Sequence, residues 1–213
     1  MRVCEIFHSI QGEGLDIGLP TVFVRSVGCN LRCGWCDTKY AYEGGAEWNL
    51  ERLEKRIASY KCRRVSLTGG EPLLQTDAPA VVSHLLSEGY DVSVETNGSL
   101  PVKDIIALDK GGRLRISMDV KCPSSKMDGK MRLENLSDLR DRDQVKFVLR
   151  DMKDYAHARA IIRDHPTKAA IVFQPVWGRR PDRIAEAVLT DGLDARVLVQ
   201  LHKVIWGVRT RGR

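Results

Sequence analysis

Apolar and polar residues alternate along the chain with two periods, one typical of buried strands and one typical of helices. Strands are expected where β-branched and apolar residues follow one another over about five positions: Thr21–Val27, Arg64–Thr68, Asp91–Glu95, Leu114–Met118, Val145–Leu149, Ala169–Phe173 and Arg196–Leu201. Helices are expected where apolar residues recur three or four positions apart between helix-end signals: from Asn49 to about Lys61, from Asp77 to Glu88, from Pro101 to before Gly111, from Met152 to Arg163 and from Pro181 to Leu189. The repeated strand–helix order predicts an α/β fold with a mainly parallel sheet, either open or closed into a full or partial barrel.

Polar and glycine-containing segments follow the ends of these strands. Because the carboxyl ends of parallel strands meet at one edge of a sheet, we expect functional residues there. The segments are Gly28-Cys29, Thr68–Glu71, Thr96–Gly98, Asp119–Lys121, Gln174-Pro175 and His202-Lys203. A polar, irregular stretch, residues 124–143, interrupts the alternation, and its charged residues from Asp138 to Asp143 are expected to form a solvated face.

The composition is that of an ordinary globular protein. The chain has 213 residues, 43% of them hydrophobic and 29% charged, which excludes a disordered or collagen-like chain and fits a single domain over residues 1–213. No apolar run reaches the ~20 residues that span a bilayer. The N-terminus lacks the pattern of a secretory signal, so a cytoplasmic location is expected. The formal net charge of +6 is compatible with an anionic substrate or nucleic acid and demonstrates neither. The basic residues Arg209, Arg211 and Arg213 are expected to form a solvated terminus.

Three of the six cysteines crowd into one short stretch. Cys29, Cys33 and Cys36 have the spacing C-x3-C-x2-C, and thiolates are soft ligands that suit iron–sulfur clusters or zinc. Three thiolates hold three corners of a cubane cluster and leave its fourth iron open to a substrate or cofactor. A structural zinc site needs four closed ligands, and Cys62, Cys122 or a distant His would have to supply the fourth.

A second motif, Thr68-Gly69-Gly70-Glu71-Pro72, follows the next predicted strand. Two consecutive glycines let the backbone approach a ligand closely. Backbone carbonyls and Glu71 would then accept hydrogen bonds from an ammonium group. A Gly-Gly turn is also an ordinary loop, but its place at a strand end, downstream of the cysteines, favours a binding role.

The cysteine motif, with the aromatic Trp35 before its last cysteine, and the Gly-Gly-Glu motif resemble those of the radical S-adenosylmethionine (SAM) superfamily. The resemblance implies a partial (βα) barrel of about six parallel strands. It also implies a [4Fe–4S] cluster on Cys29, Cys33 and Cys36 whose open iron binds SAM. A radical formed from SAM then takes hydrogen from the substrate, and no further catalytic residue is expected. The residues that the resemblance implies for SAM binding are Trp35, Gly69, Gly70, Glu71, Thr96, Asn97, Asp119, Lys121 and Gln174.

Further stretches resemble one family of this superfamily, the 7-carboxy-7-deazaguanine synthases: Phe7–Gly14, Val24-Arg25, Gly28–Leu31, Cys36–Thr38, Lys121–Ser125 and Gln200–Lys203. The family converts 6-carboxy-5,6,7,8-tetrahydropterin to 7-carboxy-7-deazaguanine with loss of ammonia. This lyase step leads to 7-deazapurine nucleosides such as queuosine in tRNA, and SAM is reused. The resemblance implies Mg2+ on Thr38 and substrate contacts from Gln11, Gly12, Glu13, Gly14, Arg25 and His202. It also implies a flavodoxin- or ferredoxin-type electron donor and a homodimer, without membrane or direct nucleic-acid contact.

Two other interpretations compete with this one. Small activases that install a glycyl radical share the short chain and the cysteine spacing, but they give no reason for Gln11–Gly14, Thr38 and His202. A zinc-stabilised RNA-binding module would fit the basic charge, but the chain has no recognisable RNA-binding motif or dense Lys/Arg stripe. In some relatives the chain ends near the substrate, soon after the His-Lys segment. Here residues 208–213 follow, which puts a role for the terminal carboxylate in doubt.

Overall fold

The computed structural model describes residues 1–208 and 211–212. Within them, nine strands form one sheet in the order β3-β1-β2-β4-β5-β6-β7-β8-β9. Strands β2 and β4 to β9 run parallel, whereas β1 pairs antiparallel with both β2 and β3. The strands are β1 Arg2–Ile10, β2 Pro20–Ser26, β3 Ala46–Glu47, β4 Arg64–Gly69, β5 Asp91–Thr96, β6 Leu114–Val120, β7 Gln144–Leu149, β8 Ala170–Pro175 and β9 Ala195–Val197. The expected α/β fold with mostly parallel strands is confirmed, and β3 and β9 remain as two unjoined edges.

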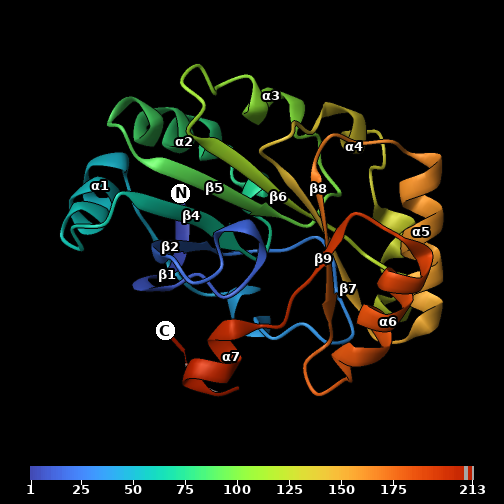
Figure 1. Ribbon diagram of the computed structural model, residues 1–213. Helices are drawn as coiled ribbons and strands as arrows, with labels where there is room; N and C mark the ends of the chain where they lie inside the picture. Colours follow the sequence, from blue (N-terminus) through green and yellow to red (C-terminus); the bar gives the residue numbers. More distant parts are fainter. Residues whose placement is uncertain (209–210, 213) are drawn as a thin grey trace.

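Helices connect most of the strands. They are α1 Leu50–Ala58, α2 Ala78–Ser87, α3 Lys103–Ile106, α4 Asn135–Asp138, α5 Met152–Asp164, α6 Pro181–Asp191 and α7 Leu201–Trp206. Figure 1 shows α1, α2, α3, α5 and α6 along the outer side of the curved sheet, with α7 apart from them. Local sequence sets the helix ends, as expected: the Asn49 side chain accepts a 2.9 Å hydrogen bond from the Arg52 N–H and caps α1. Gly192, with φ of 61°, ends α6.

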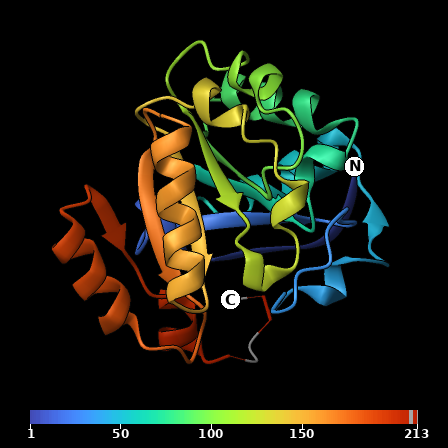
Figure 2. The ribbon, with the colours of Figure 1, turned by 90° about the vertical axis from the view of Figure 1, so that its right-hand side faces the viewer.

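The hydrophobic core lies between the sheet and the outer helices. Phe147 of β7 and Phe173 of β8 are fully buried, with ring centroids 5.8 Å apart. Tyr155 of α5 meets Phe173 edge-on at 5.5 Å, and Figure 2 shows α5 lying across this part of the sheet. Each such side chain stabilises the fold by roughly 1.5–3 kcal/mol through burial, so the strand ends are held on a rigid scaffold. In the described part of the chain, no helix is both long enough and apolar enough to cross a membrane.

The structure differs from the sequence-based expectation at both ends of the chain. The pattern does not predict β1, because Val3 is its one buried residue and the alternation is weak. The predicted strand Arg196–Leu201 is wrong at its carboxyl end, since β9 ends at Val197 and Leu201 begins α7. His202 and Lys203 therefore lie on a helix. The Leu201 N–H donates to the Gly12 carbonyl at 2.9 Å, which places α7 against the loop after β1.

The charged stretch before β7 is not uniformly solvated: the expectation is wrong for Asp143 and only partly right for Arg140, whose side chain is 26% exposed. Asp143 is 0% exposed. Its carboxylate accepts hydrogen bonds from the Ile116 N–H at 2.8 Å and from Arg140 Nε at 2.9 Å, and Arg140 also pairs with Asp109 at 2.8 Å. Buried charges require such partners. Here they attach the start of β7 to β6, which fixes the register of the strand that carries Lys146.

Candidate active site

A cavity of about 800 Å³ opens at the carboxyl ends of the parallel strands. Most of the residues that the sequence predicts for metal, SAM or substrate binding line it: Gln11, Gly12, Glu13, Arg25, Cys29, Cys33, Trp35, Cys36, Thr38, Gly69, Gly70, Thr96, Asn97, Asp119, Lys121, Gln174 and His202. They come from segments far apart in the sequence, and the sheet brings them to one place. Their individual roles stay predictions.

The cysteine loop follows β2 and forms one wall of the cavity. The Leu31 N–H lies 3.4 Å from the Cys29 sulfur, and the Asn97 side-chain amide lies 3.8 Å from it. Such N–H groups can also donate to a sulfur that is bound to a metal. Burial raises the pKa of Cys33, against the opposing charge of Lys121. The three thiols share this wall, although in the described residues no three His, Cys, Asp or Glu side chains form a compact ligand set.

The Gly-Gly turn after β4 lies directly on the cysteine loop. A Cβ atom on Gly70 would lie 2.0 Å from the Gly28 carbonyl oxygen, and one on Gly69 would lie 2.3 Å from Ser26 Oγ. The Glu71 N–H donates to that same Gly28 carbonyl at 2.8 Å. The two glycines thus allow two backbone segments to touch. Gly69 and Gly70 therefore line the cavity and also contact the backbone that leads into the cysteine loop.

Two of the predicted site residues, Glu71 and Gly14, lie behind the cavity wall. Glu71 is 0% exposed. Its carboxylate accepts hydrogen bonds from the Leu73 N–H at 3.0 Å, Thr96 Oγ1 at 2.8 Å and the Asn97 N–H at 2.6 Å. Burial raises its pKa although these hydrogen bonds oppose the rise. Where the sequence suggests a contact with a ligand ammonium, the structure shows contacts within the protein. Gly14 is buried with φ of 70°, a conformation that favours glycine.

Polar side chains at the ends of β6 and β8 continue the wall. Lys121 Nζ pairs with Asp119 Oδ2 at 2.6 Å. Burial raises the pKa of Asp119, but the charges of Lys121 and Lys146 outweigh it, so that pKa lies below its ordinary value. Gln174 is 1% exposed, and its Oε1 has no hydrogen-bond partner among the described residues. Because an unpaired buried carbonyl oxygen is costly, this position suits a donor group of a ligand.

The loop after β1 meets α7 at a second wall of the cavity. A Cβ atom on Gly12 would lie 2.2 Å from His202 Nδ1, so only glycine lets this histidine reach the cavity. Glu13 accepts hydrogen bonds from Gln200 Nε2 at 2.7 Å and from Lys146 Nζ at 2.5 Å. Burial raises the pKa of Glu13, but Lys146 and His202 outweigh it and hold the pKa well below its usual range. Burial lowers the pKa of His202.

Arg25 lies among two aromatic rings, a carboxylate and a second guanidinium group. Arg25 Nε donates to Glu5 Oε1 at 2.8 Å, and the Tyr40 hydroxyl donates to the same oxygen at 2.8 Å. The guanidinium carbon lies 5.6 Å from the centre of the Phe7 ring. Arg211 also lines the cavity and stacks 3.8 Å from the centre of the Tyr40 ring. The basic terminus is therefore more than a solvated tail at this residue, while Arg209 and Arg213 lie outside the described residues.

Thr38 lies on the wall next to the cysteine loop. Its Oγ1 is 3.8 Å from Cys36 Sγ and donates to Asp37 Oδ1 at 3.3 Å. Asp37 in turn pairs with Lys203 Nζ at 2.8 Å. Hydroxyl and carboxylate oxygens are the ligands that Mg2+ prefers, so the chemistry of this corner suits the expected ion.

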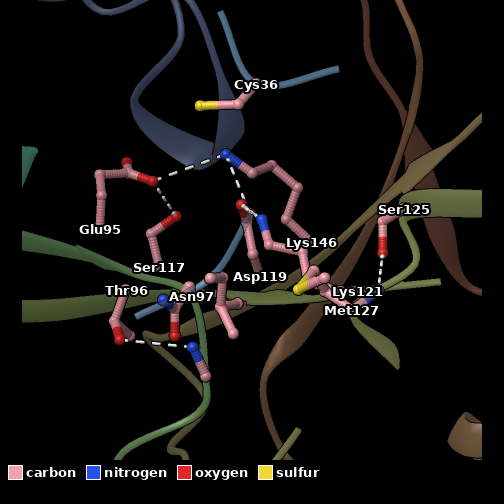
Figure 3. Close-up of polar contacts among 12 residues, drawn as sticks. Cys36, Glu95, Thr96, Asn97, Ser117, Asp119, Lys121, Ser125, Met127 and Lys146 are labelled. Carbon is pink, nitrogen blue, oxygen red and sulfur yellow. Dashed lines mark hydrogen bonds and ion pairs between the residues drawn. The ribbon is translucent and has the colours of Figure 1, made fainter. Parts of the chain in front are cut away.

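Several residues of the site were not predicted from the sequence. Figure 3 shows Lys146 and Lys121 among Glu95, Ser117 and Asp119, joined by a group of ion pairs and hydrogen bonds. The available signal was Lys146 itself, a charged residue inside the buried strand pattern Val145–Leu149. A charge in such a position needs carboxylate partners, and these come here from β5, β6 and the loop after β1.

Comparisons with known proteins show which family this chain resembles. A model of the radical SAM superfamily matches residues 23–161. The 7-carboxy-7-deazaguanine synthase of Thermoplasma acidophilum is 43% identical over 97% of this chain and 98% of its own. That of Methanospirillum hungatei is 44% identical over 96% and 85%.

Solved structures show the same fold. The crystal structure of QueE from Escherichia coli superposes with a TM-score of 0.76 at 21% identity, over 94% of each chain. Streptococcus suis SuiB bound to S-adenosylmethionine gives a TM-score of 0.57 at 12% identity, over 83% of this chain and 46% of that one.

Proposed function

The chain belongs to the radical SAM superfamily and, within it, to the 7-carboxy-7-deazaguanine synthases. We propose that the cavity at the strand ends carries out that family's reaction as follows. The substrate is 6-carboxy-5,6,7,8-tetrahydropterin and the product is 7-carboxy-7-deazaguanine, with ammonia released. The observation that supports this proposal best is the convergence of two walls. The cysteine loop and the Gly-Gly turn form one, and the loop after β1 with α7 forms the other. One sheet and one hydrophobic cluster among residues 1–208 and 211–212 support a single domain over residues 1–213.

The first wall fits the cofactors. Cys29, Cys33 and Cys36 would hold the [4Fe–4S] cluster, since their sulfurs share the cavity and N–H donors face Cys29. SAM would lie along the strand ends, where the carbonyls of the Gly-Gly turn accept from its ammonium and Gln174 Oε1 accepts from a donor group. Trp35 lines the cavity next to the cysteines and offers an aromatic face. When bound, these cofactors supply one-electron cleavage of a carbon–sulfur bond and hydrogen abstraction from unactivated carbon.

The second wall fits the substrate. The ionised Glu13 carboxylate is an acceptor, which suits the paired N–H donors of the pterin's amino-pyrimidine edge. Gln11 is 6% exposed next to it and offers both a donor and an acceptor. Arg25 and His202 lie on the same wall. A guanidinium carries five donors, so Arg25 keeps others for the substrate carboxylate while Nε holds Glu5.

Three further assignments belong to this proposal. Thr38 would bind Mg2+, and the substrate's oxygens would bind the same ion. The hard oxygen donors of Thr38 and Asp37 support this assignment. A flavodoxin- or ferredoxin-type protein would supply the electron. A homodimer is supported by exposed apolar residues near the C-terminus, Val199, Val204, Ile205 and Val208.

The competing interpretations gain no support. The Cys122 thiol is 0% exposed in the core. The Cys62 thiol donates to the Pro20 carbonyl at 3.3 Å, away from the cavity. Neither is placed to complete a zinc site with the cysteine loop. The glycyl-radical activases leave the second wall unexplained.

The test is one anaerobic incubation read by mass spectrometry. Reconstituted, reduced protein is mixed with SAM, Mg2+ and 6-carboxytetrahydropterin. We expect the deazapurine and ammonia without stoichiometric loss of SAM. Deoxyadenosine without the deazapurine would contradict the substrate, and the absence of both from cluster-loaded protein would contradict the whole proposal.

A further inference from the structure

One buried ammonium group contacts three carboxylates in the wall of the cavity. Lys146 lies within β7, and its side chain is 6% exposed. Its Nζ is 2.5 Å from Glu13 Oε2, 3.2 Å from Asp119 Oδ1 and 3.6 Å from Glu95 Oε2. The contact with Glu13 is a hydrogen bond, and those with Asp119 and Glu95 are ion pairs, which Figure 3 draws.

The three carboxylates come from different elements, and each has a second partner. Glu13, in the loop after β1, accepts from Gln200 at 2.7 Å. Glu95, in β5, accepts from Ser117 at 2.7 Å. Asp119, in β6, pairs with Lys121 at 2.6 Å and is the direct strand neighbour of Lys146. Lys146 is thus the one contact that all three share in the described part of the chain.

The charges around Glu13 make its ionisation depend on Lys146. The titratable groups that face it are Lys146 of β7, His202 of α7, Glu95 of β5 and Asp119 of β6. Burial alone raises the pKa of Glu13, and Lys146 is the largest opposing influence. In return, burial lowers the pKa of Lys146, but the three carboxylates raise it well above its ordinary value.

We propose that Lys146 is a positioning residue that keeps Glu13 ionised and aimed at the substrate. The inference rests on the proposed function, which gives Glu13 the pterin's paired N–H donors. An ionised carboxylate only accepts hydrogen bonds, whereas a protonated one carries an O–H that opposes one of those donors. Lys146 therefore acts on the substrate through Glu13, without having to contact the reacting atoms.

Replacing Lys146 by Met removes the main influence that keeps Glu13 ionised. Glu13 then faces Glu95 and Asp119 in a buried site, and its pKa rises. As pH falls through the raised pKa, Glu13 takes up a proton and the substrate loses its acceptor. We expect the pterin Kd of Lys146→Met to weaken with falling pH, by up to about tenfold per pH unit below that pKa. In the unmodified protein Glu13 stays ionised, so its Kd lacks this dependence.

The experiment is an anaerobic calorimetric titration of 6-carboxytetrahydropterin between pH 6 and 9. The protein carries its cluster and saturating SAM, but no reductant, so that binding is measured without turnover. Lys146→Arg keeps a cation next to Glu13 and should restore the profile of the unmodified protein. Lys146→Met in a Glu13→Gln background should show no added pH dependence, because no carboxyl group remains at residue 13 to titrate. His202 also titrates, and Lys146 and Glu13 both influence its pKa, so each comparison is repeated in a His202→Gln background.

Two results would overturn the inference: a Lys146→Met profile parallel to that of the unmodified protein, or a pH dependence that persists in the Glu13→Gln background. If Lys146→Met does not fold, Lys146→Met with Glu95→Gln removes one buried charge of each sign and serves for the same titration. Failure of the proposed function is distinguishable, because the unmodified protein would then neither bind nor convert the pterin.

Discussion

The carboxylate of Glu71 accepts a 2.6 Å hydrogen bond from the backbone N–H of Asn97, and this contact joins the turn after β4 to the end of β5. The same carboxylate also holds Thr96 Oγ1 at 2.8 Å. Thr96 and Asn97 line the cavity, whereas Glu71 lies behind them. The acidic residue of the Gly-Gly-Glu motif therefore fixes the positions of two residues proposed to bind SAM.

Replacing Glu71 by Gln should destabilise the fold and weaken SAM binding. A Gln side chain turns an N–H₂ group toward at least one of the donors that Glu71 now accepts from. A buried donor left without an acceptor costs about 1–3 kcal/mol. Urea unfolding and a SAM titration measure the two effects. Glu51→Gln is the matched control, because its ion pair with Lys55 is more than 70% exposed on both sides and such pairs contribute about 0–1 kcal/mol. An unfolding midpoint equal to that of the control would contradict the prediction.

Replacing Gly70 by Ala should displace the cysteine loop. The added Cβ would lie 2.0 Å from the Gly28 carbonyl oxygen and 2.9 Å from the Cys29 Cβ, and backbone atoms cannot move aside cheaply. We expect reduced iron incorporation after reconstitution, measured as iron and sulfide per chain. Gly111→Ala is the control, because its Cβ would meet no atom within 4 Å. Equal cluster content in the two variants would show that the turn does not support the loop.

Much of the fold follows from local sequence signals. Asn49 caps α1 and Gly192 ends α6 as their residue types indicate. The central strands β4, β5 and β6 alternate apolar with polar residues, and their apolar residues are buried in the core. Strand β1 escapes this reasoning, since its pairing with β2 is a long-range contact and its exposed face dilutes the pattern. Asp143 shows the same limit for charge: a run of charged residues gives their number but not the direction in which each one points.

The site is predictable where chemistry is local and not where it depends on distant partners. The spacing of Cys29, Cys33 and Cys36 is sufficient to predict a metal site. Lys146, Glu95 and Gln200 do not, because their meaning arises only when β5, β7 and α7 bring them next to Glu13 and Asp119. Glu71 illustrates the opposite error. Its motif is recognisable, but burial decides that its carboxylate faces the protein.

Replacing Cys33 by Ala should abolish the [4Fe–4S] cluster and, with it, all deoxyadenosine formation. The cluster needs a thiolate at each of three corners. Cys62 and Cys122 lie elsewhere in the fold and cannot replace the missing ligand. Cys62→Ala is the matched control, because its thiol contacts backbone carbonyls outside the cavity and should leave the cluster unchanged. Iron content and the visible absorbance of the anaerobic protein report the result. A full four-iron cluster in Cys33→Ala would refute the ligand assignment.

Replacing Thr38 by Ala should weaken the response to Mg2+ while the cluster stays intact. The substitution removes one hard oxygen ligand but leaves Cys36 and the loop backbone in place. The measurement is product formation as a function of Mg2+ concentration, with iron content determined on the same sample. Thr38→Ser keeps the hydroxyl and should behave like the unmodified protein. An unchanged magnesium dependence in Thr38→Ala would remove Thr38 from the ion's site.

Replacing Arg211 by Ala should raise the KM for the pterin by a few fold and leave kcat nearly unchanged. Arg211 stacks on Tyr40 and lines the cavity together with Arg25, so it adds positive charge where a substrate carboxylate approaches. A stacked guanidinium at an exposed site contributes about 0.5–1 kcal/mol, and salt screens its attraction for an anion. The KM of the unmodified protein should therefore rise more with ionic strength than that of Arg211→Ala. Arg211→Lys keeps the charge but loses the planar stack, and should lie between the two. A KM for Arg211→Ala that matches the unmodified protein at low salt would show that the C-terminal segment does not take part in substrate binding.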